Sequence, residues 1–289
     1  MMNKNSILTF SLIILCFFSC AFSSKAADPG TPDAVFAFAR YLEETGDYYR
    51  AITEYRRFIF FWPEHSLANE CRYRIGRSYM QGSEYSRAAE VFQELFVMDR
   101  NPTGKLQSGE SYAESLFYLH RYSLAASLLA ELETHADSND ALRLRLNRTW
   151  CYLKLRDPVQ ASELWEIPAH QPIRDAIRAL EVLPEKNPVL AGYMSALIPG
   201  AGQVYAGRWR DGVIAFLVNS LFIGGIVMAI DRDHDETAAV LGFFEAGFYT
   251  ANIYNAVNDA HKANRETWET GLDHMERLIG PPFHTGFSF

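Results

Sequence analysis

Residues 46–63 read G-D-Y-Y-R-A-I-T-E-Y-R-R-F-I-F-F-W-P, and the pattern of this stretch recurs along the chain every 37 residues. The repeated positions form six columns: Tyr48, Tyr85, Tyr122; Ala51, Ala88, Ala125; Ala39, Gly76, Ala113; Leu42, Tyr79, Leu116; Tyr55, Phe92, Leu129; and Phe58, Leu95, Leu132. A weaker fourth copy begins one residue early, with Tyr152, Ala161 and Trp165. Self-similarity at a fixed period of this size predicts a repeat architecture.

Each copy has the features of a helical hairpin. Small residues such as Ala39 and Ala51 let two helices approach closely, and the bulky columns fill the space around their crossing. Gly46-Asp47 separates the two helices, and Pro63 ends the second one. Because one hairpin cannot bury its apolar face alone, neighbouring hairpins must stack. The sequence therefore predicts an all-α solenoid of about four helical hairpins over residues 27–170, with a concave groove.

These columns resemble the tetratricopeptide repeat (TPR), over about residues 32–167. The copies are three residues longer than the usual 34-residue repeat. This length and residues 49–66 are similar to envelope TPR proteins, namely outer-membrane assembly lipoproteins and Tol-associated periplasmic TPR proteins. The copies depart from the family at Phe58, which is usually alanine, and at Pro102, which falls late in the second repeat. These departures leave the superhelical pitch open.

The resemblance implies that the first helix of each hairpin lines a groove that binds a protein partner. Carried over residue by residue, the groove wall consists of Phe36, Arg40, Tyr73, Arg77, Met80, Glu114, Phe117 and Trp150. The alternative is that the aromatic side chains pack between neighbouring repeats. Arg40 and Arg77, one repeat apart in the same column, are the better candidates for partner contacts.

Residues 1–26 have the pattern of a signal peptide. Lys4 provides the positive region, residues 7–18 the apolar region, and Ser24-Lys25-Ala26 a cleavage site. Lipidation at Cys20 is a less favoured alternative, because Phe17 stands where such motifs prefer leucine. Either route places the repeats outside the cytoplasm.

The composition changes after a linker helix and turn at residues 171–188, where a membrane module is predicted over residues 189–265. Residues 212–230 contain no charge and are long enough to span a bilayer, and residues 237–257 form a second candidate span. Residues 189–206 are interpreted as re-entrant or interfacial, and residues 266–289 as a C-terminal helix and tail. A buried soluble hairpin and a third span through 189–206 are the alternatives. The basic flanks, Arg208, Arg210, Lys262 and Arg265, favour the cytoplasm, whereas the signal peptide favours two spans.

A glycine-rich motif precedes the first candidate span. It reads P-G-x-G-Q-x-Y-x-G and comprises Pro199, Gly200, Gly202, Gln203, Tyr205 and Gly207. The motif resembles TM2-like membrane modules of bacteria and the C-terminal region of uncharacterised delta-proteobacterial TPR membrane proteins. Glycines permit close helix approach, and Gln203 and Tyr205 are able to bond backbone groups that a broken helix leaves free.

Within the candidate spans, Asn219, Glu245 and Asn252 are the polar residues with a candidate role in the membrane. Tyr249 and Asn252 share a helix face with Glu245. One interpretation is a proton or ion relay at Glu245. The favoured interpretation is that a protonated Glu245 joins Asn219 and Asn252 as an interhelical contact.

The sequence offers no motif for catalysis, a metal or a cofactor. Cys71 and Cys151 lack metal-site spacing, and the eight histidines form no H-E-x-x-H. A net charge of -8 argues against nucleic acid as a partner. The favoured function is a non-enzymatic TPR adaptor in the bacterial inner membrane, with the repeats in the periplasm, that binds a protein of envelope assembly or secretion. The alternative is a transport or membrane-insertion component that uses Glu245.

Overall fold

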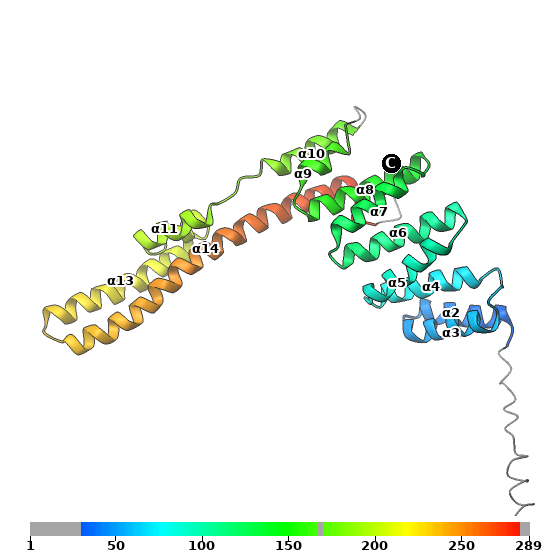
Figure 1. The fold of residues 1–289 in the computed structure, drawn as a ribbon. Coiled ribbons are helices and arrows are strands. Elements are labelled where there is room, and N and C mark those ends of the chain that lie inside the picture. The colour runs from blue at the N-terminus through cyan, green and yellow to red at the C-terminus, as the bar shows by residue number, and fades with distance from the viewer. Residues whose placement is uncertain (1–29, 167–169, 284–289) are drawn as a thin grey trace, which may run out of the picture. The chain divides into compact units, whose positions relative to one another are not determined.

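The structure, a computed structural model, describes residues 30–166 and 170–283 (Figure 1). The predicted signal peptide, the cleavage site and Cys20 lie outside the described residues. The chain divides into two units, Met1–Arg121 and Tyr122–Phe289, which are described separately below.

The described part of the first unit consists of helices that pack in chain order. They are α2 (Pro32–Glu44), α3 (Tyr48–Phe61), α4 (Ala68–Gln81), α5 (Tyr85–Met98) and α6 (Pro102–Tyr118). Each helix contacts the next one along the chain. The Thr31 side chain caps α2 by accepting a hydrogen bond from the Ala34 amide. The Asn101 side chain caps α6 by accepting one from the Thr103 amide. Gly46 adopts a positive φ of 83° in the turn between α2 and α3.

The repeat columns form the core of this unit. Ala39, Ala51 and Ala88 are completely buried at the helix crossings, and Tyr55 and Phe92 are completely buried beside them. A Cβ atom at Gly76 would lie 2.6 Å from the Phe92 ring, so an alanine at this position would require the ring to shift. The all-α, TPR-like fold class is therefore confirmed in the packing of the repeats themselves.

Phe58, the residue that departs from the family pattern, is also completely buried. Its ring lies 5.4 Å from that of Trp62 and 5.3 Å from that of His65, measured between centroids. Phe36 approaches it from α2 at 6.1 Å. A phenylalanine thus fills space at the end of the first hairpin that an alanine would leave empty.

The second unit begins with three further repeat helices, followed by three short helices and two long ones. Its helices are α7 (Tyr122–Glu133), α8 (Ser138–Lys154), α9 (Pro158–Glu163), α10 (Gln171–Glu181), α11 (Pro188–Leu197), α12 (Ala201–Tyr205), α13 (Trp209–Asp231) and α14 (Asp235–Ile279). The helices from α7 to α10 each pack against the next one. Ala125, Leu129, Ala161 and Trp165 are completely buried, as their repeat columns require.

Helix α14 is one continuous helix of 45 residues, which corresponds to about 67 Å. Its first half pairs with α13, and its second half contacts α10 and buries Leu272, Met275 and Ile279. The chain has no break at the predicted boundary between 265 and 266. The reason is local, because residues 258–270 contain neither glycine nor proline.

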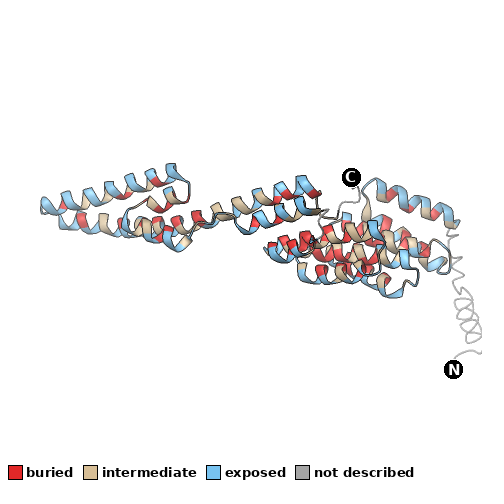
Figure 2. Cartoon of the chain, turned by 90° about the horizontal axis from the view of Figure 1, so that it is seen from above, coloured by how far each residue is buried: buried red, intermediate tan, exposed pale blue. Residues whose placement is uncertain are grey.

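Helix α13 has the length and composition of a membrane span. It contains 23 residues with a mean hydropathy of 2.5, and only 11% of its apolar window is buried inside the protein. A core helix of a soluble protein would be mostly buried instead. Figure 2 shows exposed residues along α13 and along the part of α14 that pairs with it. Among the described residues, α13 is the one helix that meets this description, and the second span at 237–257 remains a prediction.

We predict that Ala88→Leu lowers the free energy of unfolding by about 1–3 kcal/mol, because Ala88 has no free space around it. The measurement is chemical denaturation of the full chain in a neutral detergent, followed by circular dichroism. Ala37→Leu, at an exposed position of α2, is the matched control and should change stability by less than about 0.5 kcal/mol. Equal effects of the two substitutions would contradict the assignment of the crossing.

Candidate functional site

Several side chains predicted for the groove wall of the first unit pack inside that unit. Phe36 is half-buried, with its ring 6.1 Å from the rings of Tyr55 and Phe58, and the Arg74 guanidinium lies 5.8 Å above it. Met80 and Phe117 are buried, and the Ser115 hydroxyl donates to the Met80 sulfur at 3.2 Å. These contacts agree with the alternative interpretation, in which the aromatic column stabilises the solenoid.

The polar column of the groove wall links neighbouring repeats. Arg77 forms an ion pair of 2.9 Å with Glu114, exactly one repeat further along the chain. Burial raises the pKa of Glu114, and the charge of Arg77 opposes that shift. Tyr73 on α4 likewise shares a 3.1 Å hydrogen bond with Ser111 on α6. Arg77 and Tyr73 therefore already have partners within the unit.

Arg40 differs from Arg77, although both stand in the same column. It pairs at 2.8 Å with Glu44 on its own helix, and its side chain is 48% exposed. Exposed pairs of this kind contribute little to stability, so the guanidinium is available to another carboxylate. The structure separates two arginines that sequence analysis treated as equivalent.

A further polar network connects the first two hairpins and was missed in the sequence. Tyr55 donates a 2.6 Å hydrogen bond to Glu43, and Arg74 bridges Glu43 at 3.0 Å and Glu70 at 2.7 Å. Burial, and then the bond to Glu43, raises the pKa of Tyr55 far above its usual value. The charged members of this network do not recur at the 37-residue period, so the repeat pattern gave no signal for them.

Trp150, predicted for the groove wall, is covered by the end of its own chain. Its indole nitrogen donates to the Gly280 carbonyl at 3.0 Å, and its side chain is 2% exposed. Asn147 on the same helix accepts the Phe283 amide at 2.7 Å. Residues following α14 occupy this side of the predicted groove wall, so Trp150 packs within its unit, closer to the alternative interpretation.

The glycine-rich motif brings α11, α12, α13 and α14 together. Gly200 has a positive φ of 88°, and a Cβ atom there would collide with the Gly212 carbonyl. At Gly202, a Cβ atom would meet the Ala191 carbonyl and would lie 2.7 Å from the Ser195 hydroxyl. These glycines allow an approach that no other residue permits.

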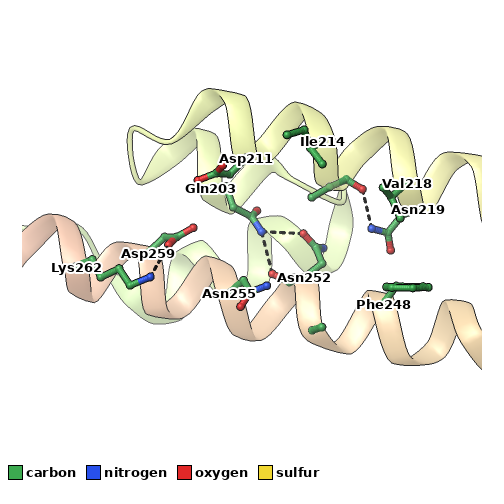
Figure 3. A pocket seen from close by; sticks show the side chains of 12 residues that line it. Gln203, Asp211, Ile214, Val218, Asn219, Phe248, Asn252, Asn255, Asp259 and Lys262 are labelled. Atoms are coloured by element: carbon green, nitrogen blue, oxygen red, sulfur yellow. Dashed lines mark hydrogen bonds and ion pairs between the residues drawn. The ribbon is translucent and has the colours of Figure 1, made fainter.

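A buried amide pair, Gln203 and Asn252, joins this motif to α14 (Figure 3). The Gln203 amide nitrogen donates to the carbonyl and to the side-chain oxygen of Asn252, at 3.1 and 2.9 Å. Asn252 also accepts the Gly200 amide at 3.1 Å and donates to the Ser195 carbonyl at 3.2 Å. The bonds to Gly200 and Ser195 use backbone groups that the break between α11 and α12 leaves free.

Tyr205 closes the same motif at its other end. Its hydroxyl accepts the Asn187 amide at 3.0 Å, so the chain from 188 to 205 doubles back on itself. Tyr249 donates to the Ala196 carbonyl at 2.7 Å near the bend. Gln203 and Tyr205 thus bond backbone groups, as their place in the motif led us to expect.

A cavity of about 450 Å³ opens between α12, α13 and α14 (Figure 3). Apolar side chains such as Ile214, Val218 and Phe248 line one part of it. Charged residues line another: Asp211, Asp259 and Lys262. Arg208 holds Asp211 at 2.7 Å and Asp259 at 3.1 Å, so these charges neutralise one another.

The predicted contact of Glu245 with Asn219 and Asn252 does not form. Asn252 is occupied by the motif, and the Asn219 amide nitrogen donates to the Ala215 carbonyl at 2.7 Å. In the part of the chain that the structure describes, both Glu245 oxygens and the Asn219 side-chain oxygen are buried without a hydrogen-bond partner. The polar face of α14 is therefore divided between a satisfied region at Asn252 and an unsatisfied one at Glu245.

The two cysteines of the described region are structural. Cys71 and Cys151 are buried and unpaired as thiols, and burial raises the pKa of each to about 12. Such thiols are poor nucleophiles at neutral pH. Among the described residues, no group of three or more His, Cys, Asp or Glu side chains is placed to hold a metal ion.

No protein-family model matches the chain, and no curated protein matches it either. Two solved structures are similar: the TPR-like repeats of a protein described as a kinesin light chain from Podosopora anserina, and a variant of the same repeats. Both are 14% identical to this chain with a TM-score of 0.40. The variant covers 76% of this chain and 96% of its own length, and the other covers 75% and 97%.

We predict that Gly202→Ala destabilises the contact between the motif and α14 by about 1–3 kcal/mol, because the added methyl group meets Ala191 and Ser195. The thermal unfolding of the full chain in neutral detergent measures the effect. Gly224→Ala is the control, since a Cβ atom there has no neighbour within 4 Å. That substitution should be neutral or should stabilise α13 by up to about 1 kcal/mol. A larger loss at Gly224 than at Gly202 would refute the prediction.

Proposed function

We propose that this protein is a non-enzymatic TPR adaptor anchored in the bacterial inner membrane. Its helical hairpins lie in the periplasm and bind a protein partner of envelope assembly or secretion. The observation that supports this proposal is the combination, in one chain, of stacked repeat hairpins with the exposed apolar helix α13. TPR-type hairpins present surfaces for protein partners, and an exposed apolar helix of 23 residues is suited to lipid.

Contacts across the second unit support two spans rather than three. The Asn264 side chain bonds both the amide and the carbonyl of Lys186, at 2.7 and 2.8 Å. This contact favours a topology in which the residues before α11 and the residues after the predicted second span lie on one side of the membrane, with an even number of crossings. Residues 189–206, the alternative third span, are broken after α11, and the 10 residues of α11 reach only about 15 Å, which argues against a third crossing.

The basic flanks are compatible with this orientation. Arg208 pairs with Asp211 and Asp259, and Lys262 lies 3.6 Å from Asp259. Two of the four basic residues that favour the cytoplasm thus have acidic partners close to them. Two basic residues on each side of the hairpin give only a weak positive-inside preference, so the proposal gives more weight to the predicted signal peptide.

The partner contact is proposed for the wall of the first unit near Arg40. Arg77 already binds Glu114, whereas Arg40 is largely exposed. Tyr41 beside it is 60% exposed and Phe38 is 43% exposed. Exposed arginine and aromatic side chains are typical contacts for a protein partner, and the guanidinium is suited to an acidic segment.

A transport or membrane-insertion component is the second candidate function. The buried and unpartnered carboxylate of Glu245 favours it, because such a group within a membrane span is costly unless it has a role. The two functions differ in their need for this carboxylate, which transport requires and an adaptor does not.

We predict that single cysteines report two spans. In a background lacking Cys71 and Cys151, Glu269→Cys should react with a membrane-impermeant thiol reagent in intact cells, and Asp233→Cys should be protected until the membrane is opened. Both native positions are exposed in the protein, so protection reports the membrane and not the fold. The reverse labelling pattern would establish an odd number of crossings and refute this topology.

We also predict that Arg40→Glu reduces capture of the partner in cross-linked pull-downs from intact cells by about tenfold, because one charge-assisted contact becomes repulsive. Arg50→Glu is the control, since Arg50 is exposed on α3 and pairs only with Asp47 at 3.0 Å among the described residues. Equal capture by both variants, each with unchanged circular dichroism, would place the binding surface elsewhere.

A further inference from the structure

A second, larger cleft in the second unit lies beside the residues that follow the predicted second span. Its volume is about 950 Å³. Basic side chains from three separate segments line it: Arg156 after α8, Lys186 before α11, and His261 and Arg265 on α14. Glu185 is the one carboxylate among the described residues that line it. This local excess of positive charge contrasts with the net charge of -8 for the whole chain.

The cations of this cleft are not neutralised by acidic partners. In the described ranges 30–166 and 170–283, Arg156, Lys186 and Arg265 form no ion pair within 4.0 Å of a carboxylate. Arg156 instead lies 5.1 Å from the Trp268 ring and Lys186 lies 5.0 Å from the Tyr205 ring. Aromatic faces position cations without removing their charge. The cleft therefore retains the capacity to bind an anion.

The wall that carries these cations is held rigidly. Asn264 fixes the backbone of Lys186 through two hydrogen bonds, at 2.7 and 2.8 Å. Helix α11 begins at Pro188, which also lines the cleft, so the positive end of its dipole lies there. The amide side chain of Asn258 also lines the cleft and adds a neutral hydrogen-bond donor. Cations, an amide donor and the positive end of a helix dipole together match the charge and oxygens of a phosphate group.

We propose that this cleft binds the phosphate of an anionic phospholipid headgroup. Residues 258–265 directly follow the predicted span 237–257, which places the cleft at the depth of lipid phosphates. The source of the phosphate thus rests on the proposed membrane anchorage, whereas the phosphate chemistry rests on the cleft alone. The bound headgroup would fix the hairpin α13–α14 and the adjoining repeats against the membrane surface.

Native mass spectrometry of the full chain in a neutral detergent tests this proposal, with phosphatidylglycerol and phosphatidylcholine as competing probes. The wild-type chain should retain phosphatidylglycerol about tenfold more tightly than phosphatidylcholine. The double variant Arg156→Gln, Arg265→Gln should lose that preference. The control Lys154→Gln, Arg210→Gln removes the same charge at exposed positions outside the cleft, and its preference should stay within about twofold of wild type.

Arg265→Gln alone, on an exposed position of α14, provides a second variant that preserves the Arg156–Trp268 contact and should lose part of the preference. Equal losses in the cleft and control variants, or no preference in the wild type, would overturn the proposal.

Inorganic phosphate that displaces the lipid at equal concentration would support the phosphate site and assign it to a soluble anion. Flotation with phosphatidylcholine vesicles tests anchorage separately, so a chain that floats without lipid preference contradicts only the cleft.

Discussion

Close approach of helices at small side chains is the constraint on which the rest of this structure depends. In the repeats, Ala39, Ala51 and Ala88 are completely buried at the crossings, and larger side chains fill the space around them. In the second unit, Gly200 and Gly202 serve the same purpose, because a Cβ atom at either would collide with a neighbouring backbone. A helix satisfies its own backbone hydrogen bonds, so its stability in a fold depends on how well one face is covered.

The second requirement is to satisfy polar groups where helices break inside the protein. Gln203 and Asn252 do this at the turn between α11 and α12, and Asn264 does it at Lys186. Buried amides suit this task because each offers both donors and acceptors. Glu245 has no such partner among the described residues, and this makes it the residue whose role separates an adaptor from a transport component.

The distribution of free and occupied surfaces shapes the proposed function. Arg77 and Trp150, both predicted for the groove, already have partners inside their units. Arg40 and the basic cleft around Arg265 retain exposed charge. The proposed adaptor would accordingly bind its protein partner through the first unit and its membrane through the second, with α14 as the helix common to the membrane hairpin and the last repeats.

The sequence by itself determined the helical class, the repeat register and the apolar segment at 212–230, because each depends on a pattern visible in neighbouring residues. It also indicated that Gln203 and Tyr205 would bond backbone groups. It did not reveal which backbone groups these are, nor that Gly280 covers Trp150, nor that Arg156, Lys186 and Arg265 line one cleft. Residues 130 positions apart, such as Trp150 and Gly280, meet only because α14 continues without a break to the repeats. Such pairings leave no periodic trace in a single chain, so only the tertiary structure decides them.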